Sequence, residues 1–359
     1  MRGYNLFVDS LKKVGWDEAW ANSFRVHAGA GLSPARVAAR EGSLYRLWTE
    51  GGDRDGAISG KFKLALSKGG KLPAVGDWVA VDLKQTQGVI QAVLPRRTMV
   101  SRKEAGERDR MQVLVANVDV IFVVSGLDGD FNLRRLERYL AVVREGGSKG
   151  VVLLNKADLC PEAPQRLAET ILVARDLPVH VISAKKGEGV DVLEQYLKPA
   201  TTVALLGSSG AGKSTLVNRI LGRERQATKE TREDSRGRHT TTSREMFLTP
   251  GGAILLDTPG LREIQLADVA EGIRQTFSDI EALFGACKFD NCRHHKEPGC
   301  AVLAAMDAGT LDAARWDSYL KLKGEQAVRG MKDWQKRRHD RKFARVVDES
   351  LKRKKKPLP

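Results

Sequence analysis

A glycine-rich stretch near the middle of the chain has the residue types and spacing of a phosphate-binding loop. It follows the apolar run TTVALL and precedes STLVNRIL, which predict a strand before it and a helix after it. Glycines let backbone N–H groups turn toward phosphate oxygens, and a helix start adds partial positive charge. We expect Lys213 to reach the β- and γ-phosphates and support catalysis, and the Ser214 hydroxyl to bind Mg²⁺. The residues expected around the phosphates are Gly207, Ser208, Ser209, Gly210, Ala211, Gly212, Lys213, Ser214 and Thr215.

Two segments further along the chain are typical of a magnesium-dependent triphosphatase. The sequence DTPG at 257–260 follows the apolar run GAILL, so Asp257 is expected to hold Mg²⁺ through water. The segment 228–243 is polar and nearly devoid of apolar residues, which predicts a mobile switch loop. One threonine of 240–242 is expected to complete the Mg²⁺ shell, and we favour Thr241. The alternative is a plain solvated loop rich in Ser and Thr.

Two segments that come earlier in the chain have the residues that read a guanine base. The sequence NKAD ends an apolar strand run, and the carboxylate of Asp158 can accept hydrogen bonds from guanine N1–H and the exocyclic amine. Adenine offers neither donor in that arrangement, so a carboxylate left unpaired would disfavour ATP. The sequence SAK closes another strand run, as in loops whose backbone contacts guanine O6. The residues expected at the base are Asn155, Lys156, Asp158, Ser183, Ala184 and Lys185.

These loops occur in the reverse of the order found in ordinary GTPases, where the phosphate loop comes first. A doubly wound sheet keeps its binding loops at the carboxyl ends of its strands, whatever order the chain visits them. The alternation of β-branched runs with helical stretches over 110–280 favours such a sheet. The sequence therefore predicts an α/β fold with a circularly permuted P-loop GTPase domain. The segment after DTPG leads directly into a Cys/His region, to which switch movement can be passed.

That Cys/His region offers three thiolates and an imidazole within fourteen residues. This donor set suits closed coordination of one structural Zn²⁺ by Cys287, Cys292, His294 and Cys300. On spacing alone His295 could replace its neighbour. The remaining cysteine, Cys160, stands apart, so a disulfide framework is not expected and the compartment is the reducing cytosol.

Composition divides the rest of the chain into further segments. Alternating strand-like runs after the N-terminus predict a small OB-like β-barrel, which binds RNA or acts only as a packing module. Its Tyr45, Trp48 and Trp78 are either stacking platforms for bases or core residues. The expected boundaries are 1–35 for an N-terminal helical extension, 36–105 for the barrel, 110–280 for the GTPase domain, 281–330 for an α-helical zinc-binding domain and 331–359 for a basic extension.

The chain is strongly basic. It has 359 residues with a net charge of +15, and residues 329–359 alone carry thirteen Lys and Arg against four acidic residues. Such a distribution points to a polyanionic partner, although a charged tail can also serve solubility. No apolar run approaches a membrane span, and the N-terminus lacks the apolar core of a secretory signal. We expect a soluble cytoplasmic monomer with no membrane partner.

With these motifs in place, the chain resembles the RsgA (YjeQ) family of bacterial ribosome-biogenesis GTPases from about residue 36 to 325. The resemblance rests on AVGDWV, the permuted order of NKAD, SAK, phosphate loop, GRHTTT and DTPG, and the pattern C-x-H-x-x-E-P-G-C. It implies GTP/GDP as ligand, binding to the small ribosomal subunit and its rRNA late in assembly, and hydrolysis stimulated by that subunit. It also favours His294 over His295 as the zinc ligand.

One position departs from ordinary GTPases. Many place a water-orienting Gln directly after D-x-x-G, whereas this chain has Leu261, whose apolar side chain cannot orient water. The resemblance makes His239 the candidate for this role, and the alternative is a histidine that only fills a polar loop. Two rival functions remain open: a GTP-gated RNA-binding scaffold in which hydrolysis is incidental, and an ATP-dependent enzyme in which NKAD occurs by coincidence.

Overall fold

The computed structural model describes residues 9–67, 72–103, 111–222, 244–257 and 269–327. Contacts divide the chain into two compact units. The first comprises 1–102, 111–132 and 146–265, and the second comprises 103–110, 133–145 and 266–359. Among the described residues, no helix has both the length and the hydrophobicity that a membrane span requires.

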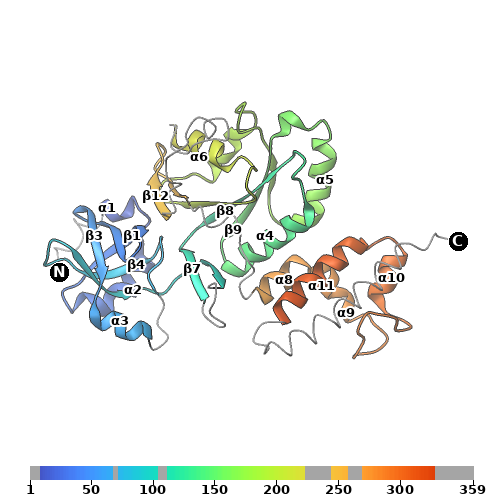
Figure 1. Ribbon diagram of the computed structural model, residues 1–359, viewed down its shortest axis with the longest axis horizontal. Helices are drawn as coiled ribbons and strands as arrows, with labels where there is room; N and C mark the ends of the chain where they lie inside the picture. Colours follow the sequence, from blue (N-terminus) through green and yellow to red (C-terminus); the bar gives the residue numbers. More distant parts are fainter. Residues whose placement is uncertain (1–8, 68–71, 104–110, 223–243, 258–268, 328–359) are drawn as a thin grey trace. The chain divides into compact units, whose positions relative to one another are not determined.

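A closed five-stranded barrel lies at the start of the first unit, drawn in blue in Figure 1. Its elements are β1 (Ser33–Glu41), β2 (Leu44–Thr49), β3 (Gly52–Ile58), α3 (Gly60–Ser67), β4 (Trp78–Asp82) and β5 (Gly88–Val93). The strands are hydrogen-bonded in the order β1-β2-β3-β5-β4, and β4 pairs again with β1 to close the barrel. This confirms the predicted OB-like barrel. Tyr45 and Trp78 are almost fully buried in it, so both are packing residues, whereas Trp48 is partly exposed.

Two short helices precede the barrel and pack on it. They are α1 (Asp9–Lys12) and α2 (Glu18–Ala28), and the Asp17 carboxylate caps α2 by accepting a hydrogen bond from the Trp20 N–H at 2.9 Å. Trp16 and Trp20 bury their rings, and that of Trp16 lies 4.7 Å from the ring of Trp78. The N-terminal extension is therefore part of the barrel's hydrophobic core. Residues 1–8 of the predicted helical extension lie outside the described ranges.

A mostly parallel sheet forms the rest of the first unit. Its strands are β8 (Val120–Gly126), β9 (Lys149–Asn155), β10 (Val179–Val181), β11 (Thr202–Leu206), β12 (Arg244–Leu248) and β13 (Ile254–Asp257). They lie in the order β10-β9-β8-β11-β13-β12, and all pair in parallel except β12 with β13. The other elements of this unit are α5 (Ala163–Ala174), α6 (Lys213–Leu221), the short 3₁₀ helices η1 (Ala157–Leu159) and η2 (Val190–Gln195), and the two-stranded sheet of β6 (Met99–Lys103) and β7 (Met111–Ala116).

The barrel and this sheet are hydrogen-bonded to each other. Strand β1 pairs antiparallel with β12, with Ala39 opposite Glu245 and Arg40 opposite Arg244. The side chains of Arg46 and Glu245 form an ion pair at the same place. Barrel and parallel strands together therefore make one sheet of eleven strands.

The second unit is helical, and its C-terminal helices run from orange to red in Figure 1. It contains α4 (Leu133–Gly146), α8 (Ala270–Thr276), α9 (Ser278–Phe284), α10 (Ala301–Asp307) and α11 (Ala313–Ala327). The buried Arg315 of α11 binds Asp279 of α9 and Glu137 of α4, each at 2.8 Å. Helix α4 thus belongs to the C-terminal helices, although its sequence follows the GTPase strand β8.

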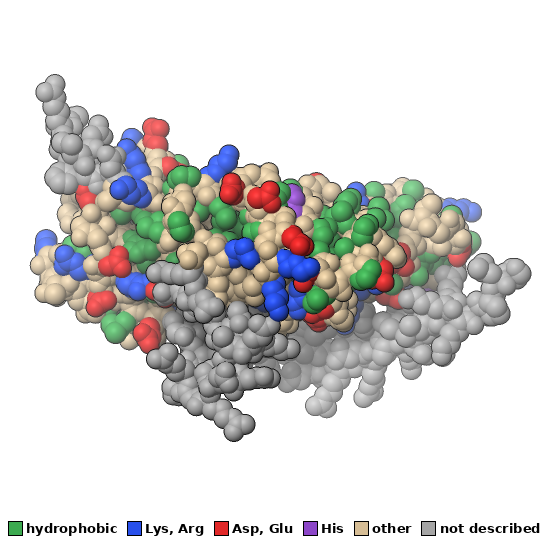
Figure 2. Space-filling model, turned by 90° about the horizontal axis from the view of Figure 1, so that it is seen from above, with side chains coloured by type: hydrophobic (Ala, Val, Ile, Leu, Met, Phe, Trp, Pro, Cys, Tyr) green, Lys and Arg blue, Asp and Glu red, His purple; other side chains and the backbone are tan. Residues whose placement is uncertain are grey.

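On the face drawn in Figure 2, the Lys and Arg side chains of the described residues are interspersed with Asp and Glu. Most of the chain's net charge comes instead from 329–359, which lies beyond the last described residue, Ala327. The predicted role of that segment in binding a polyanion therefore stays a prediction.

Candidate nucleotide site and metal centre

The side chain of Asn155 brings together the three loops that the sequence predicts to bind a nucleotide. It is the last residue of β9 and is 2% exposed. Its Nδ2 donates to the carbonyl of Ala211 at 2.8 Å, and its Oδ1 accepts from the N–H of Ala184 at 2.9 Å. The base loop (residues 155–158), the phosphate loop (residues 207–215) and the SAK loop (residues 183–185) thus meet, as a circularly permuted GTPase site requires.

The phosphate loop joins the end of β11 to the start of α6. Gly212 has φ +92°, and a Cβ there would lie 2.1 Å from Nδ2 of Asn155, so only glycine allows the two loops to approach this closely. The Lys213 ammonium donates to the carbonyls of Gly207 and Ser208, which places it over the loop. Ser214 and Thr215 lie in the first turn of α6.

The carboxylate expected to read guanine is held by a serine of the SAK loop. Ser183 Oγ donates to Oδ1 of Asp158 at 2.6 Å, and this hydrogen bond lowers the pKa of the Asp158 carboxyl below its usual value. Asp158 is therefore ionised at neutral pH, as acceptance of two N–H donors demands. The N–H of Lys186 donates to the same Ser183 hydroxyl at 3.2 Å and helps to fix the turn.

Two acids of the loop after β8 also contact the nucleotide loops, and sequence reasoning missed both. Asp128 forms an ion pair with Lys156 of the base loop. Burial raises the pKa of Asp128, but the hydrogen bond and charge of Lys156 outweigh it, so the pKa lies below its usual value. Asp130 accepts from Ser208 Oγ of the phosphate loop at 2.6 Å. The available signal was their position after a buried strand that lies beside β9 and β11.

The expected magnesium residues are described only in part. Asp257 is the last residue of β13, which is the parallel neighbour of β11, so the phosphate loop and Asp257 leave adjacent strand ends. Ser214 and Asp257 carry the hydroxyl and carboxylate oxygens that Mg²⁺ prefers. The other predicted switch residues, Thr241 and His239, lie outside the described residues, as does Leu261.

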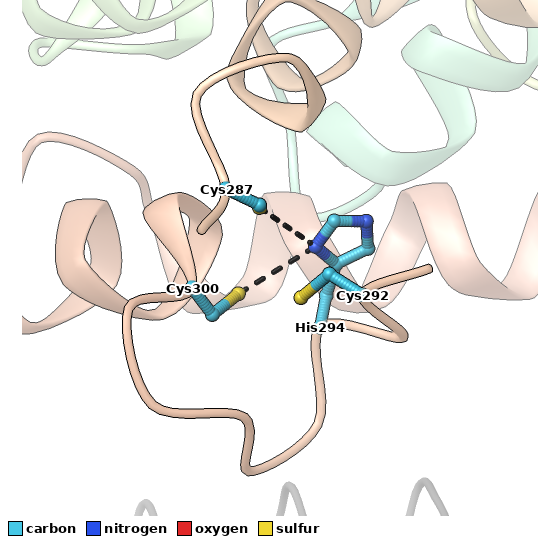
Figure 3. A group of neighbouring side chains, drawn as sticks. All are labelled: Cys287, Cys292, His294 and Cys300. Atoms are coloured by element: carbon cyan, nitrogen blue, oxygen red, sulfur yellow. Dashed lines mark hydrogen bonds between the residues drawn. The ribbon is translucent and has the colours of Figure 1, made fainter. Parts of the chain in front are cut away.

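The four predicted zinc ligands converge in the second unit (Figure 3). The ligand atoms of Cys287, Cys292, His294 and Cys300 all lie within 4.8 Å of one another. His294 Nδ1 is 3.5 Å from the sulfurs of both Cys287 and Cys300. Three sulfurs and one ring nitrogen at this spacing fit tetrahedral Zn²⁺. The cluster contains His294 and not His295, in agreement with the choice made from the sequence pattern.

Neighbouring residues fix the loop that presents these ligands. Glu297 accepts from the N–H groups of His295 at 2.7 Å, Lys296 at 3.0 Å and Arg293 at 3.1 Å. These backbone hydrogen bonds, that of His295 first, lower the pKa of Glu297 to about 2. The His294 ring stacks on Phe284 with their centroids 4.3 Å apart. The loop is therefore shaped around the cluster by a carboxylate and an aromatic ring.

Comparison with known proteins agrees with this geometry. A family model described as RsgA GTPase matches residues 93–267. A small ribosomal subunit biogenesis GTPase RsgA of Opitutus terrae is 48% identical, over 89% of this chain and 90% of the relative. The crystal structure of YjeQ from Thermotoga maritima has a TM-score of 0.62 at 24% identity, covering 84% of this chain and 100% of that one. YloQ, described as a circularly permuted GTPase, has a TM-score of 0.58 at 23% identity, over 84% and 97% respectively. The chain therefore belongs to the RsgA family and is a circularly permuted GTPase.

Proposed function

We propose that this chain binds the small ribosomal subunit, assists its late maturation, and hydrolyses GTP to GDP and phosphate when the subunit stimulates it. The observation that carries the proposal is the pair of hydrogen bonds made by the Asn155 side chain. Its Nδ2 donates to the Ala211 carbonyl of the phosphate loop, and its Oδ1 accepts from the Ala184 N–H of the SAK loop. Relatives named small ribosomal subunit biogenesis GTPase RsgA match nearly the whole chain and supply the subunit as partner.

In the nucleotide site, the base and the phosphates have separate sets of residues. Asp158 accepts hydrogen bonds from guanine, Lys156 lies against the ring, and the backbone of Ala184 and Lys185 faces O6. The loop from Gly207 to Thr215 surrounds the phosphates. Ser214, Thr241 and Asp257 would hold Mg²⁺, which neutralises charge on the β- and γ-phosphate oxygens when bound.

Within this proposal, His239 orients the attacking water. The support is chemical, because Leu261 occupies the position where many GTPases carry Gln and has no polar atom to offer. His239→Ala should abolish most subunit-stimulated turnover at saturating GTP while leaving GDP affinity unchanged. A variant that turns over at the wild-type rate removes His239 from the mechanism.

The remaining parts of the chain are proposed to serve binding to the subunit. Cys287, Cys292, His294 and Cys300 hold one structural Zn²⁺ that stabilises the loop between α9 and α10. The barrel and the basic segment 331–359 contact rRNA, and the chain acts as a cytoplasmic monomer. Truncation after residue 328 should flatten the salt dependence of subunit binding, because fewer phosphate charges are neutralised. An unchanged slope would show that the tail does not touch RNA.

The decisive experiment compares turnover of GTP and ATP with and without purified small subunits. We expect GTP turnover to rise many-fold with subunits and ATP turnover to stay at background. Equal GTP rates with and without subunits would instead favour a GTP-gated scaffold. Asp158→Asn provides the control for the base, because an amide should lose GTP and prefer XTP, whose C2 oxygen replaces the amine.

A further inference from the structure

An arginine on the helix that follows the phosphate loop binds the back of the SAK loop. Arg219 of α6 donates Nε–H to the carbonyl of Ala184 at 2.8 Å and Nη2–H to the carbonyl of Lys185 at 3.1 Å. One planar guanidinium thus holds two successive peptide groups. It does so from the helix whose first residue is Lys213.

The turn after the SAK loop leaves space for the Arg219 guanidinium. Gly187 has φ +85°, and a Cβ there would lie 2.6 Å from Nη1 of Arg219, so glycine leaves the space that the guanidinium occupies. The turn itself is closed by a hydrogen bond from the Gly187 N–H to the carbonyl of Ser183 at 2.7 Å. The carbonyls of Ala184 and Lys185 are thereby presented to α6.

The chemical consequence follows from which groups share a peptide bond. The carbonyl of Ala184 belongs to the same peptide group as the N–H of Lys185. A cation on that carbonyl polarises the peptide, so the N–H becomes a stronger donor. The N–H of Ala184 is bonded to Asn155, whereas the peptide that Arg219 polarises carries the N–H of Lys185.

We infer that Arg219 is a positioning residue that sets specificity for the six-position of the purine, by strengthening and aiming the SAK-loop N–H toward the O6 acceptor of guanine. A stronger donor and a positive charge behind it favour a carbonyl oxygen and disfavour the amino group of adenine. This inference rests on the proposed assignment of Ala184 and Lys185 to guanine.

The test uses Arg219→Met in the full chain, with binding of four ribose-labelled diphosphates followed by equilibrium fluorescence titration. GDP and IDP carry O6, whereas ADP and 2,6-diaminopurine riboside diphosphate carry an amine there. We expect the dissociation constants of GDP and IDP to rise about tenfold, as for one weakened charge-assisted hydrogen bond, and those of the two amines to stay within about twofold. Arg219→Lys, which retains the charge, should recover part of the loss.

Arg219 is exposed, so its truncation leaves no core cavity, and Arg274→Met on α8 is the matched control for removing an exposed arginine. Equal weakening of all four diphosphates, or no weakening of any, would overturn the inference. Asp158→Asn distinguishes a failure of the proposed role of Arg219 from a failure of the proposed guanine site. If it switches preference to XDP while Arg219→Met is silent, only the role of Arg219 fails. If it does not, the guanine site itself is wrongly assigned.

Discussion

The Asn155 side chain donates a hydrogen bond of 2.8 Å to the carbonyl of Ala211, 56 positions further along the chain. This bond joins the base loop to the phosphate loop through protein atoms alone, with no contribution from a nucleotide. In a permuted chain the two loops are connected by a different path from that of ordinary GTPases. Direct side-chain contacts must therefore hold the loops in register.

Replacing Asn155 by Ala should weaken GDP binding by about 10- to 100-fold, because the loops lose the side chain that joins them and a buried polar group left without its partner costs about 1–3 kcal/mol. Asn155→Asp separates the two bonds, since a carboxylate still accepts from Ala184 but cannot donate to Ala211. We expect Asp to be as damaging as Ala if the bond to Ala211 dominates. Calorimetric titration with GDP measures both, and wild-type affinity in Asn155→Ala would show that the loops meet without this link.

The hydrogen bond from Ser183 predicts a pH effect. The pKa of Asp158 is lowered in the folded protein, so the ionised form and the affinity it supports are present at higher pH and are lost as pH falls through that pKa. Ser183→Ala removes the donor and raises the pKa toward its ordinary value of about 3.9. GDP affinity of the variant should therefore begin to fall at a higher pH than that of the wild type. Titrations from pH 7 down to about pH 3, with circular dichroism to exclude acid unfolding, measure the shift, and superimposable acid limbs would contradict it.

Metal analysis of the purified protein should find one zinc per chain. His294→Ala should lose the metal and the hydrogen-exchange protection of residues 285–302, because a three-ligand site binds zinc far more weakly. His295→Ala is the matched control, being adjacent in sequence but outside the cluster. Retention of zinc by His294→Ala, or its loss from His295→Ala, would reassign the fourth ligand.

The buried ion pair between Arg315 and Glu137 predicts a large effect on the helical unit. The Glu137 side chain is fully buried, and burial raises its pKa. Removing Arg315 leaves the more exposed Arg134, at 2.6 Å, as the counter-charge of this carboxylate. The expected cost is therefore below the about 3–5 kcal/mol of a buried charge with no partner. Arg315→Met should accelerate hydrogen exchange in α4 and α11, and Glu137→Gln in the same chain should recover part of the loss. Arg274→Met, which removes an exposed ion pair with Glu271, should change hydrogen exchange little.

Sequence reasoning could predict the nucleotide loops and the Cys/His cluster because each set is short, local and placed after a strand or within one loop. Asn155 was expected at the base because it ends an apolar strand run, and the structure adds its hydrogen bonds with Ala211 and Ala184. Asp128 and Arg219 could not be found in this way, since each acts on a loop distant in sequence and no local pattern names its partner. The same limit applies to α4, whose amphipathic pattern predicts a buried face but not that Arg315 lies opposite it. The residue types of Tyr45 and Trp78 are compatible with stacking on bases or with packing in the barrel core. Only their burial in the structure shows that they are core residues.

The pairing of β1 with β12 has a consequence for how the chain can be divided. If the first hundred residues were removed, the backbone donors and acceptors of β12 that now face Ala39 and Arg40 would become an open sheet edge. Such an edge recruits any other extended strand, including that of a second truncated molecule. We therefore expect the GTPase sheet to aggregate when it is produced without the barrel, because β1 of the barrel covers the edge strand β12.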